Sequence, residues 1–334
     1  MPQVETVKGA VDTADLGRVL AHEHVANVTD WVQRDHPALS WSGRTREGVA
    51  AAIGRELARI KASGIDTLVD CTAMGHSRDV ALVAAANAAV DINIVCATGL
   101  YTYDALPHFI ERRPPSRTPD GALEDVLVGM FLTDIREGIQ GTSIKAGIIK
   151  CATDKLGVTP NIDRILRAVA AAHRASGVPI TTHTDVATRN GLEQQRIFAE
   201  EGVDLSRVVI GHSGDSDDID YLSALIERGS YVGADRFGLY LEGWPTLAQR
   251  IETVRALVER GFVQRILLSH DASIFTDWYE RTGPNARELP ADWHQTHIVD
   301  DVIPAMLAAG ITDEQIDTML RANPRRLFDV QGAY

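Results

Sequence analysis

Histidine, lysine and aspartate residues recur in this chain at the ends of short apolar runs. His22 and His24 end the run Arg18–His24, and an extended strand directs residues two apart to the same face. Residues of these types also end other apolar runs: Lys150, His183, His212 and Asp271. Imidazole and carboxylate groups are natural ligands of Zn²⁺ and similar divalent ions. The pattern therefore indicates a metal site.

Each of these residues taken alone has an ordinary structural explanation. A single His-x-His pair is a weak signal, and Lys150 could extend its amine into water beyond the end of its strand. Lys145 competes with Lys150, but alternation places the two on opposite faces. A buried ammonium beside metal cations is costly, so an inward Lys150 has to be neutral, displaced or chemically changed. The joint pattern of four histidines and an aspartate favours a metal site.

Eight apolar runs alternate with longer helical patterns along the chain. The runs are Arg18–His24, Thr67–Thr72, Ile92–Thr98, Ala146–Cys151, Pro179–His183, Val208–His212, Tyr231–Asp235 and Ile266–Asp271. Continuous apolar runs are typical of parallel strands that are buried on both faces. Several helical patterns stop at glycine: Thr45–Ser63, Asn161–Ser176, Gly191–Glu201 and Ile219–Arg228. These units predict an α/β protein with a (β/α)₈ TIM barrel, formed as a single domain by residues 1–334.

Two connections are long for a compact domain. Tyr101–Asp134 follows the third predicted strand, and Ala272–His297 follows the eighth and precedes a predicted final helix, His297–Ala309. Long connections are often functional loops or lids. Both follow the carboxyl ends of strands, where the active sites of such barrels lie.

Composition excludes several classes of function. The 334 residues carry a formal net charge of −13, which argues against nucleic acid as a partner. The longest apolar stretches are too short to span a bilayer, so we expect no membrane association. The N-terminus lacks the pattern of a secretory signal, and the three cysteines, Cys71, Cys96 and Cys151, suit reduced, buried thiols. We therefore expect a cytoplasmic protein.

The chain resembles the phosphotriesterase family of the amidohydrolase superfamily, and more narrowly its phosphotriesterase-like lactonases. The matching segments extend over almost the whole chain: GAVDTADLGRVLAHEHV, ATGLYTY, KAGIIKCATD, PITTHTD, GLEQQRIFAEEGVD, RVVIGHSGDSDDIDYL, GADRFGL, ILLSHD and NPRRLF. The segments after Asp271 and after the seventh predicted strand differ from the pattern of these lactonases, and these segments bear on substrate preference.

The resemblance implies a role for each matching residue. His22, His24 and Asp271 would bind a buried metal ion, and His183 and His212 a more exposed one. Lys150 would be carboxylated by CO₂ and would bridge the two ions, which removes the charge problem. Zinc is the expected metal, with cobalt, manganese or iron as alternatives. Tyr101 and Arg236 would lie beside the metals as further catalytic residues, although Arg236 could instead form a structural ion pair with Asp235 or a neighbouring carboxylate.

The implied activity is hydrolysis of N-acyl-homoserine lactones, which is quorum quenching, by a homodimer. Water activated between the metals would attack the lactone carbonyl, and Asp271 would take up the proton. A long apolar groove, shaped in part by the loop with Trp278 and Trp293, would hold the acyl chain. The alternatives are a phosphotriesterase, a lactonase for other aliphatic lactones, and a barrel without catalysis. A deaminase-like barrel with one metal is disfavoured, because it lacks the lysine of strand four.

Overall fold

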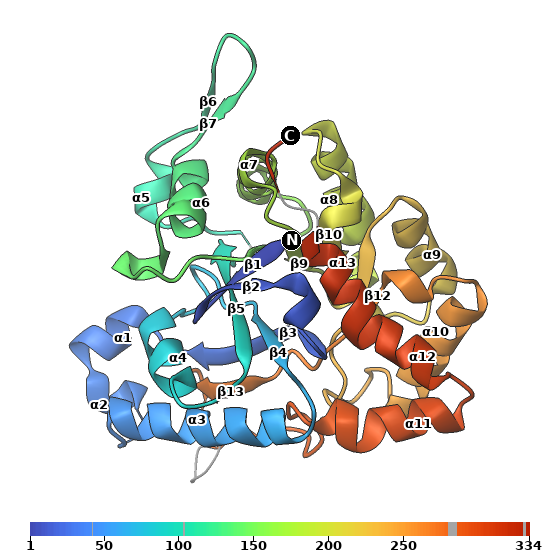
Figure 1. The fold of residues 1–334 in the computed structure, drawn as a ribbon. Coiled ribbons are helices and arrows are strands. Elements are labelled where there is room, and N and C mark those ends of the chain that lie inside the picture. Colours follow the sequence, from blue (N-terminus) through green and yellow to red (C-terminus); the bar gives the residue numbers. More distant parts are fainter. Residues whose placement is uncertain (42, 103, 280–285, 330–331) are drawn as a thin grey trace.

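Parallel strands form a curled sheet at the centre of the molecule, with helices around it (Figure 1). The computed structural model describes residues 1–334 except 42, 103, 280–285 and 330–331. The central strands are β3 (Val19–Asn27), β4 (Thr67–Asp70), β5 (Asn93–Gly99), β8 (Ile148–Ala152), β9 (Ile180–His183), β10 (Val208–Ile210), β11 (Tyr231–Ala234), β12 (Ile266–Leu268) and β13 (Ser273–Thr276). All eight predicted strands are present, and β13 is an addition.

The sheet closes through the segment that joins β12 to β13. Its strands run in the order β12-β11-β10-β9-β8-β5-β4-β3-β13. β13 pairs in parallel with β3, and the Asp271 amide donates to the carbonyl of His22 at 3.0 Å. The eighth predicted strand, Ile266–Asp271, is present only as the shorter β12, and β13 begins beyond its end and pairs with β3. This closure confirms the (β/α)₈ barrel.

Helices follow the strands and pack against the outside of the sheet. They are α1 (Asp30–Asp35), α2 (Pro37–Ser40), α3 (Arg46–Ala62), α4 (Val80–Asn87), α5 (His108–Glu111), α6 (Val126–Arg136), α7 (Pro160–Ser176), α8 (Asn190–Glu200), α9 (Ile219–Glu227), α10 (Leu247–Glu259), α11 (Ile303–Ala308), α12 (Asp313–Asp317) and α13 (Asn323–Asp329). The four helices predicted from glycine stops are confirmed to within one or two residues. At the end of α7, Gly177 adopts φ 77°, a left-handed conformation that glycine adopts without strain.

The two long connections contain more regular structure than expected. The first holds α5, the hairpin of β6 (Ser116–Arg117) and β7 (Leu123–Glu124), and most of α6. The Asp125 side chain caps the start of α6. Over a few residues at a time, however, the apolar residues of this helix also fit the pattern of a strand. The second connection holds β13. The predicted helix His297–Ala309 is present as a π-helical turn, Ile298–Val302, that continues into α11, but it is not the final helix, because α12 and α13 follow it.

The amino-terminal end of the barrel is closed by apolar packing. An antiparallel hairpin of β1 (Gln3–Thr6) and β2 (Gly9–Asp12) lies there together with α13. Val4, Leu16 and Phe328 pack with side chains inside the barrel, among them Val69 and Cys71. Polar groups that converge inside the barrel are thus confined to the carboxyl ends of the strands. Among the described residues, no helix is both long and apolar enough to cross a bilayer.

Candidate active site

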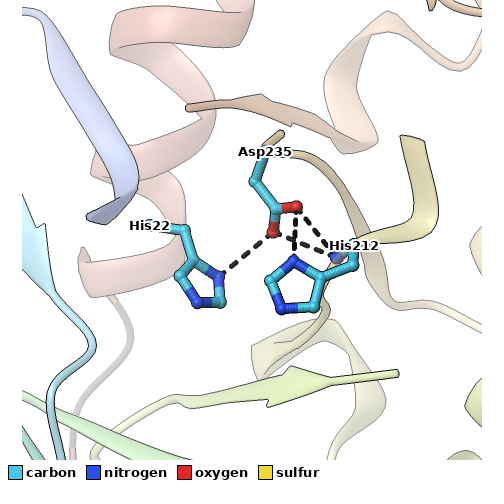
Figure 2. Close-up of side chains that lie close together, drawn as sticks. All are labelled: His22, His212 and Asp235. Carbon is cyan, nitrogen blue, oxygen red and sulfur yellow. Dashed lines mark hydrogen bonds and ion pairs between the residues drawn. The ribbon is translucent and has the colours of Figure 1, made fainter. Parts of the chain in front are cut away.

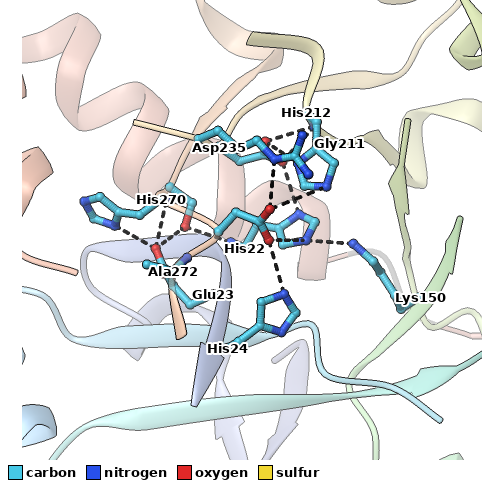
Figure 3. Close-up of polar contacts among 12 residues, drawn as sticks. His22, Glu23, His24, Lys150, Gly211, His212, Asp235, His270 and Ala272 are labelled. Carbon is cyan, nitrogen blue, oxygen red and sulfur yellow. Dashed lines mark hydrogen bonds and ion pairs between the residues drawn. The ribbon is translucent and has the colours of Figure 1, made fainter. Parts of the chain in front are cut away.

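The six predicted ligands converge at the carboxyl ends of the barrel strands. His22 and His24 come from β3, Lys150 from β8, His183 from the end of β9, His212 from beyond β10, and Asp271 from between β12 and β13. The five histidine and lysine side chains are buried. Nε2 of His24 lies 3.2 Å from Oδ1 of Asp271, and Nε2 of His22 lies 3.6 Å from the same oxygen. Figure 3 shows His22, His24 and Lys150 directed toward a common centre.

Lys150 points into the barrel and is buried among the histidines. Its Nζ lies 2.7 Å from Nε2 of His22, and burial lowers the pKa of the amine. The close approach of β5 to β8 depends on Gly99, because a Cβ at that position would lie 1.9 Å from the carbonyl oxygen of Lys150. Lys145, the competing candidate, is only partly buried. Lys150 is therefore the inward member of the pair that alternation places on opposite faces.

Two of the histidines near Lys150, His183 and His212, are suited to bind cations. Burial lowers the pKa of His212 to about 4, with the charge of Arg236 acting in the same direction. Burial also holds the pKa of His183 well below its ordinary value. Nδ1 of His212 lies 3.0 Å from Asp235, while its buried Nε2 has no hydrogen-bond partner among the described residues. A neutral imidazole whose Nε2 lone pair faces two other imidazoles and a carboxylate is a fitting donor for a divalent metal ion.

Asp235 is a functional candidate that the sequence reasoning treated only as an ion-pair partner. Its two carboxylate oxygens lie 3.1 Å from Nδ1 of His22 and 3.0 Å from Nδ1 of His212 (Figure 2). Its carboxylate also accepts the backbone amide of His212 at 2.9 Å. One buried carboxylate thus fixes the tautomer and orientation of two candidate ligands. Asp235 ends the predicted run Tyr231–Asp235. The same search for ligand-type residues at the ends of apolar runs could therefore have found it.

Glu23 is a second carboxylate that the sequence reasoning did not single out. It is fully buried on the opposite face of β3 from the two histidines. Its Oε1 accepts hydrogen bonds from the Ser269 hydroxyl and from the amide and ring nitrogens of His270, and its Oε2 accepts the amide of Ala272. His270 is accordingly turned away from the candidate ligands. Between these anchored residues, Asp271 adopts φ 55°, so Glu23 holds an unfavourable backbone conformation in place.

Arg236 contacts the candidate ligand Asp271 directly. Its Nε lies 2.9 Å from Oδ2 of Asp271, and its NH1 lies 2.9 Å from Oδ2 of Asp215. The ion pair of Arg236 is therefore with Asp271 and a neighbouring carboxylate, while Asp235 binds the histidines. Burial alone would raise the pKa of Asp271, but His212 and Arg236 hold that pKa well below its ordinary value.

Next to the ligand cluster is a cavity of about 670 Å³, whose lining includes His183, Arg236 and Trp244. Charged residues such as Lys155, Asp185 and Arg189 also line it, so this cavity is more polar than the apolar groove expected for an acyl chain. Trp293 of the second long connection donates its indole N–H to the carbonyl of His270 at 2.8 Å. Residues 280–285 of that connection lie outside the described residues.

Tyr101 lies at the edge of the cluster, with its ring centroid 5.6 Å from that of His183. The same ring stacks on His76 at 4.0 Å. His76 is buried beside the candidate ligand His24, with ring centroids 4.3 Å apart. His76 follows Gly75 in a loop after β4, and no pattern in the sequence there predicts a position beside the ligands.

A parallel barrel with histidine, lysine and aspartate side chains gathered at the carboxyl ends of its strands defines a barrel hydrolase. The chain matches the phosphotriesterase family over residues 2–328 and belongs to that family. It is 36% identical to the aryldialkylphosphatase of Saccharolobus solfataricus, over 96% of this chain and 98% of that protein.

Two solved structures illustrate the likeness. The phosphotriesterase from Mycobacterium tuberculosis is 46% identical, with a TM-score of 0.90 and complete coverage of both chains. A mutant of a PTE-like lactonase from Deinococcus radiodurans is 33% identical, with a TM-score of 0.85 and coverage of 97% of this chain and 99% of that one.

Replacing Glu23 with Gln should disturb the segment that carries Asp271. The amide nitrogen of glutamine would face at least one of the four donors that Glu23 now accepts, so we expect the free energy of unfolding to fall by about 1–3 kcal/mol. We also expect weaker metal retention during dialysis. Glu242→Gln, at an exposed position, is the matched control and should change stability by less than about 0.5 kcal/mol. Equal metal retention in the two variants would contradict the positioning role of Glu23.

Proposed function

We propose that this protein is a hydrolase with two metal ions that opens the ring of N-acyl-homoserine lactones. The observation that carries the proposal is the convergence of six ligand-type side chains around Lys150, with Arg236 on Asp271. We further propose that residues 1–334 form one catalytic domain, which acts as a cytoplasmic homodimer.

The proposed ligands divide between two metal positions. His22, His24 and Asp271 offer atoms that all lie within 4.8 Å of one another, which supports one position, and His183 and His212 would bind at the other. A carboxylated Lys150 would connect them, because a neutral buried amine is the form that reacts with CO₂. Zinc is the proposed metal, since imidazole and carboxylate suit it. When bound, the pair of ions would polarise the substrate carbonyl and lower the pKa of a water molecule.

The residues of this chain would then orient the substrate and move the proton. Asp271, whose low pKa keeps it ionised, would accept the proton of the attacking water and pass it to the leaving alkoxide. Arg236 keeps its charge at any working pH, so it would hold Asp271 in place without competing for that proton. The Tyr101 hydroxyl would bind the lactone at the side of His183.

A lactone is favoured over a phosphotriester as the main substrate. The support is the likeness to a solved PTE-like lactonase, together with the resemblance of the segment that carries Arg236 to the phosphotriesterase-like lactonases. Hydrolysis of phosphotriesters by the same metals is proposed as a weak side activity, because both reactions develop charge on one oxygen. Other aliphatic lactones are the alternative substrates, and the polar cavity beside His183 is compatible with short or polar substituents.

Replacing Asp271 with Asn should separate catalysis from folding. Asparagine tolerates the left-handed backbone conformation of this position, so the fold should persist, while the proton acceptor is lost. We expect lactone kcat/KM to fall by at least about 100-fold, with an unchanged far-ultraviolet circular dichroism spectrum. Asp91→Asn, at an exposed position away from the cavity, is the matched control. Full turnover by the Asp271 variant would refute the assigned role.

Substrate preference is tested by comparing kcat/KM for an N-acyl-homoserine lactone and for paraoxon on the same metal-loaded preparation. The proposal predicts a preference for the lactone of at least about 100-fold, or about 2.7 kcal/mol of transition-state stabilisation. A panel of lactones with different acyl chains would define the preferred length. Higher efficiency on paraoxon would instead establish the phosphotriesterase alternative.

A further inference from the structure

The loops after β4 and β5 are joined next to the candidate ligands. The amide of Tyr101 donates to the carbonyl of Met74 at 2.8 Å. A Cβ at Gly75 would lie 2.4 Å from the carbonyl oxygen of Tyr101, and Gly75 has φ 77°. Glycine at this position therefore permits the close approach of the two loops. The approach brings the rings of His76 and Tyr101 together.

His76 is the middle member of a stack of three rings. Its centroid lies 4.0 Å from that of Tyr101, with an interplanar angle of 11°, and 4.8 Å from that of Trp278, with an angle of 30°. The three rings come from three different loops, after β4, β5 and β13. An aromatic contact of this kind adds stability beyond that from the burial of area. His76 therefore connects three loops that are otherwise distant in the sequence.

The backbone of His76 is fixed to the strand that carries His22 and His24. The side-chain amide of Asn27 donates to the carbonyl of His76 at 3.1 Å. The amide of Val28 donates to the carbonyl of Ser77. The indole N–H of Trp278 donates to the hydroxyl of Ser77 at 3.1 Å, so the third ring is held at the same place. The position of the stack is thus set by the end of β3.

The stack extends from solvent to the ligand cluster. Trp278 is 48% exposed, whereas His76 is 6% exposed. At the inner end, His76 packs edge-on against His24, and Tyr101 packs edge-on against His183. The three rings therefore form one aromatic wall beside the site at which a substrate would meet the metals.

We propose that His76 is a positioning residue that determines substrate selectivity by holding Tyr101 and Trp278 together as this wall. The inference rests on the proposed lactonase function, because the wall would contact the acyl substituent of the lactone. A flat, rigid wall accepts an apolar chain along its faces and restricts branched or bulky substituents. Without a stacking residue at position 76, Tyr101 and Trp278 lose the ring that both contact, and the alignment of their faces is no longer enforced.

The test compares His76→Leu, which cannot stack, with His76→Phe, which can. His108→Leu, at an exposed position, is the matched control. The first readout is the ratio of kcat/KM for a linear and a branched N-acyl-homoserine lactone. We expect His76→Leu to change that ratio at least about tenfold, or about 1.4 kcal/mol, while His76→Phe and His108→Leu retain it. Metal content per chain should be equal in all four proteins.

The second readout does not depend on turnover. Quenching of Trp278 fluorescence by acrylamide, isolated by subtracting the signal of matched Trp278→Phe variants, should rise in His76→Leu and stay unchanged in His76→Phe. An unchanged ratio and unchanged quenching in His76→Leu would overturn the proposal, as would metal loss in both His76 variants. If the unsubstituted protein opens no lactone, the proposed function fails, and the quenching result still decides whether His76 holds the wall.

Discussion

The burial of a lysine amine among histidines is the constraint on which this site depends. Lys150 extends from a fully buried strand and ends 2.7 Å from a ring nitrogen of His22, where an ammonium beside metal cations would be strongly unfavourable. Burial lowers its pKa, so the neutral amine is accessible. Carboxylation would convert this neutral amine into an anion with two oxygen ligands.

Carboxylates outside the proposed ligand set hold the ligands in place. Asp235 contacts the Nδ1 atoms of both His22 and His212, and so it couples the two proposed metal positions through one buried group. Glu23 anchors the residues on both sides of Asp271. Arg236 adds a permanent positive charge on Asp271 itself. Each of these three charged groups orients a proposed ligand. The geometry of the cluster therefore depends on the charged residues behind the ligands as well as on the ligands themselves.

The sequence predicted the strand ends well and the contacts between loops poorly. Apolar runs and alternation identify inward residues at the carboxyl ends of strands, so the predicted ligands do converge. β13 was missed because Ser273–Thr276 is short and only partly buried. The partners of Glu23 are 246 or more residues away in the chain, and those of His76 lie on two other loops. Such contacts depend on barrel closure and loop packing, which no local pattern encodes.

The most direct measurement of the central claim is ¹³C nuclear magnetic resonance of protein loaded with zinc in ¹³C-labelled bicarbonate. The account predicts a carbamate carbon signal together with two metal ions per chain, and both features should be lost in Lys150→Arg, whose guanidinium cannot be deprotonated in a protein. An unmodified amine at Lys150 in a fully active enzyme, with no carbamate signal, would contradict the account.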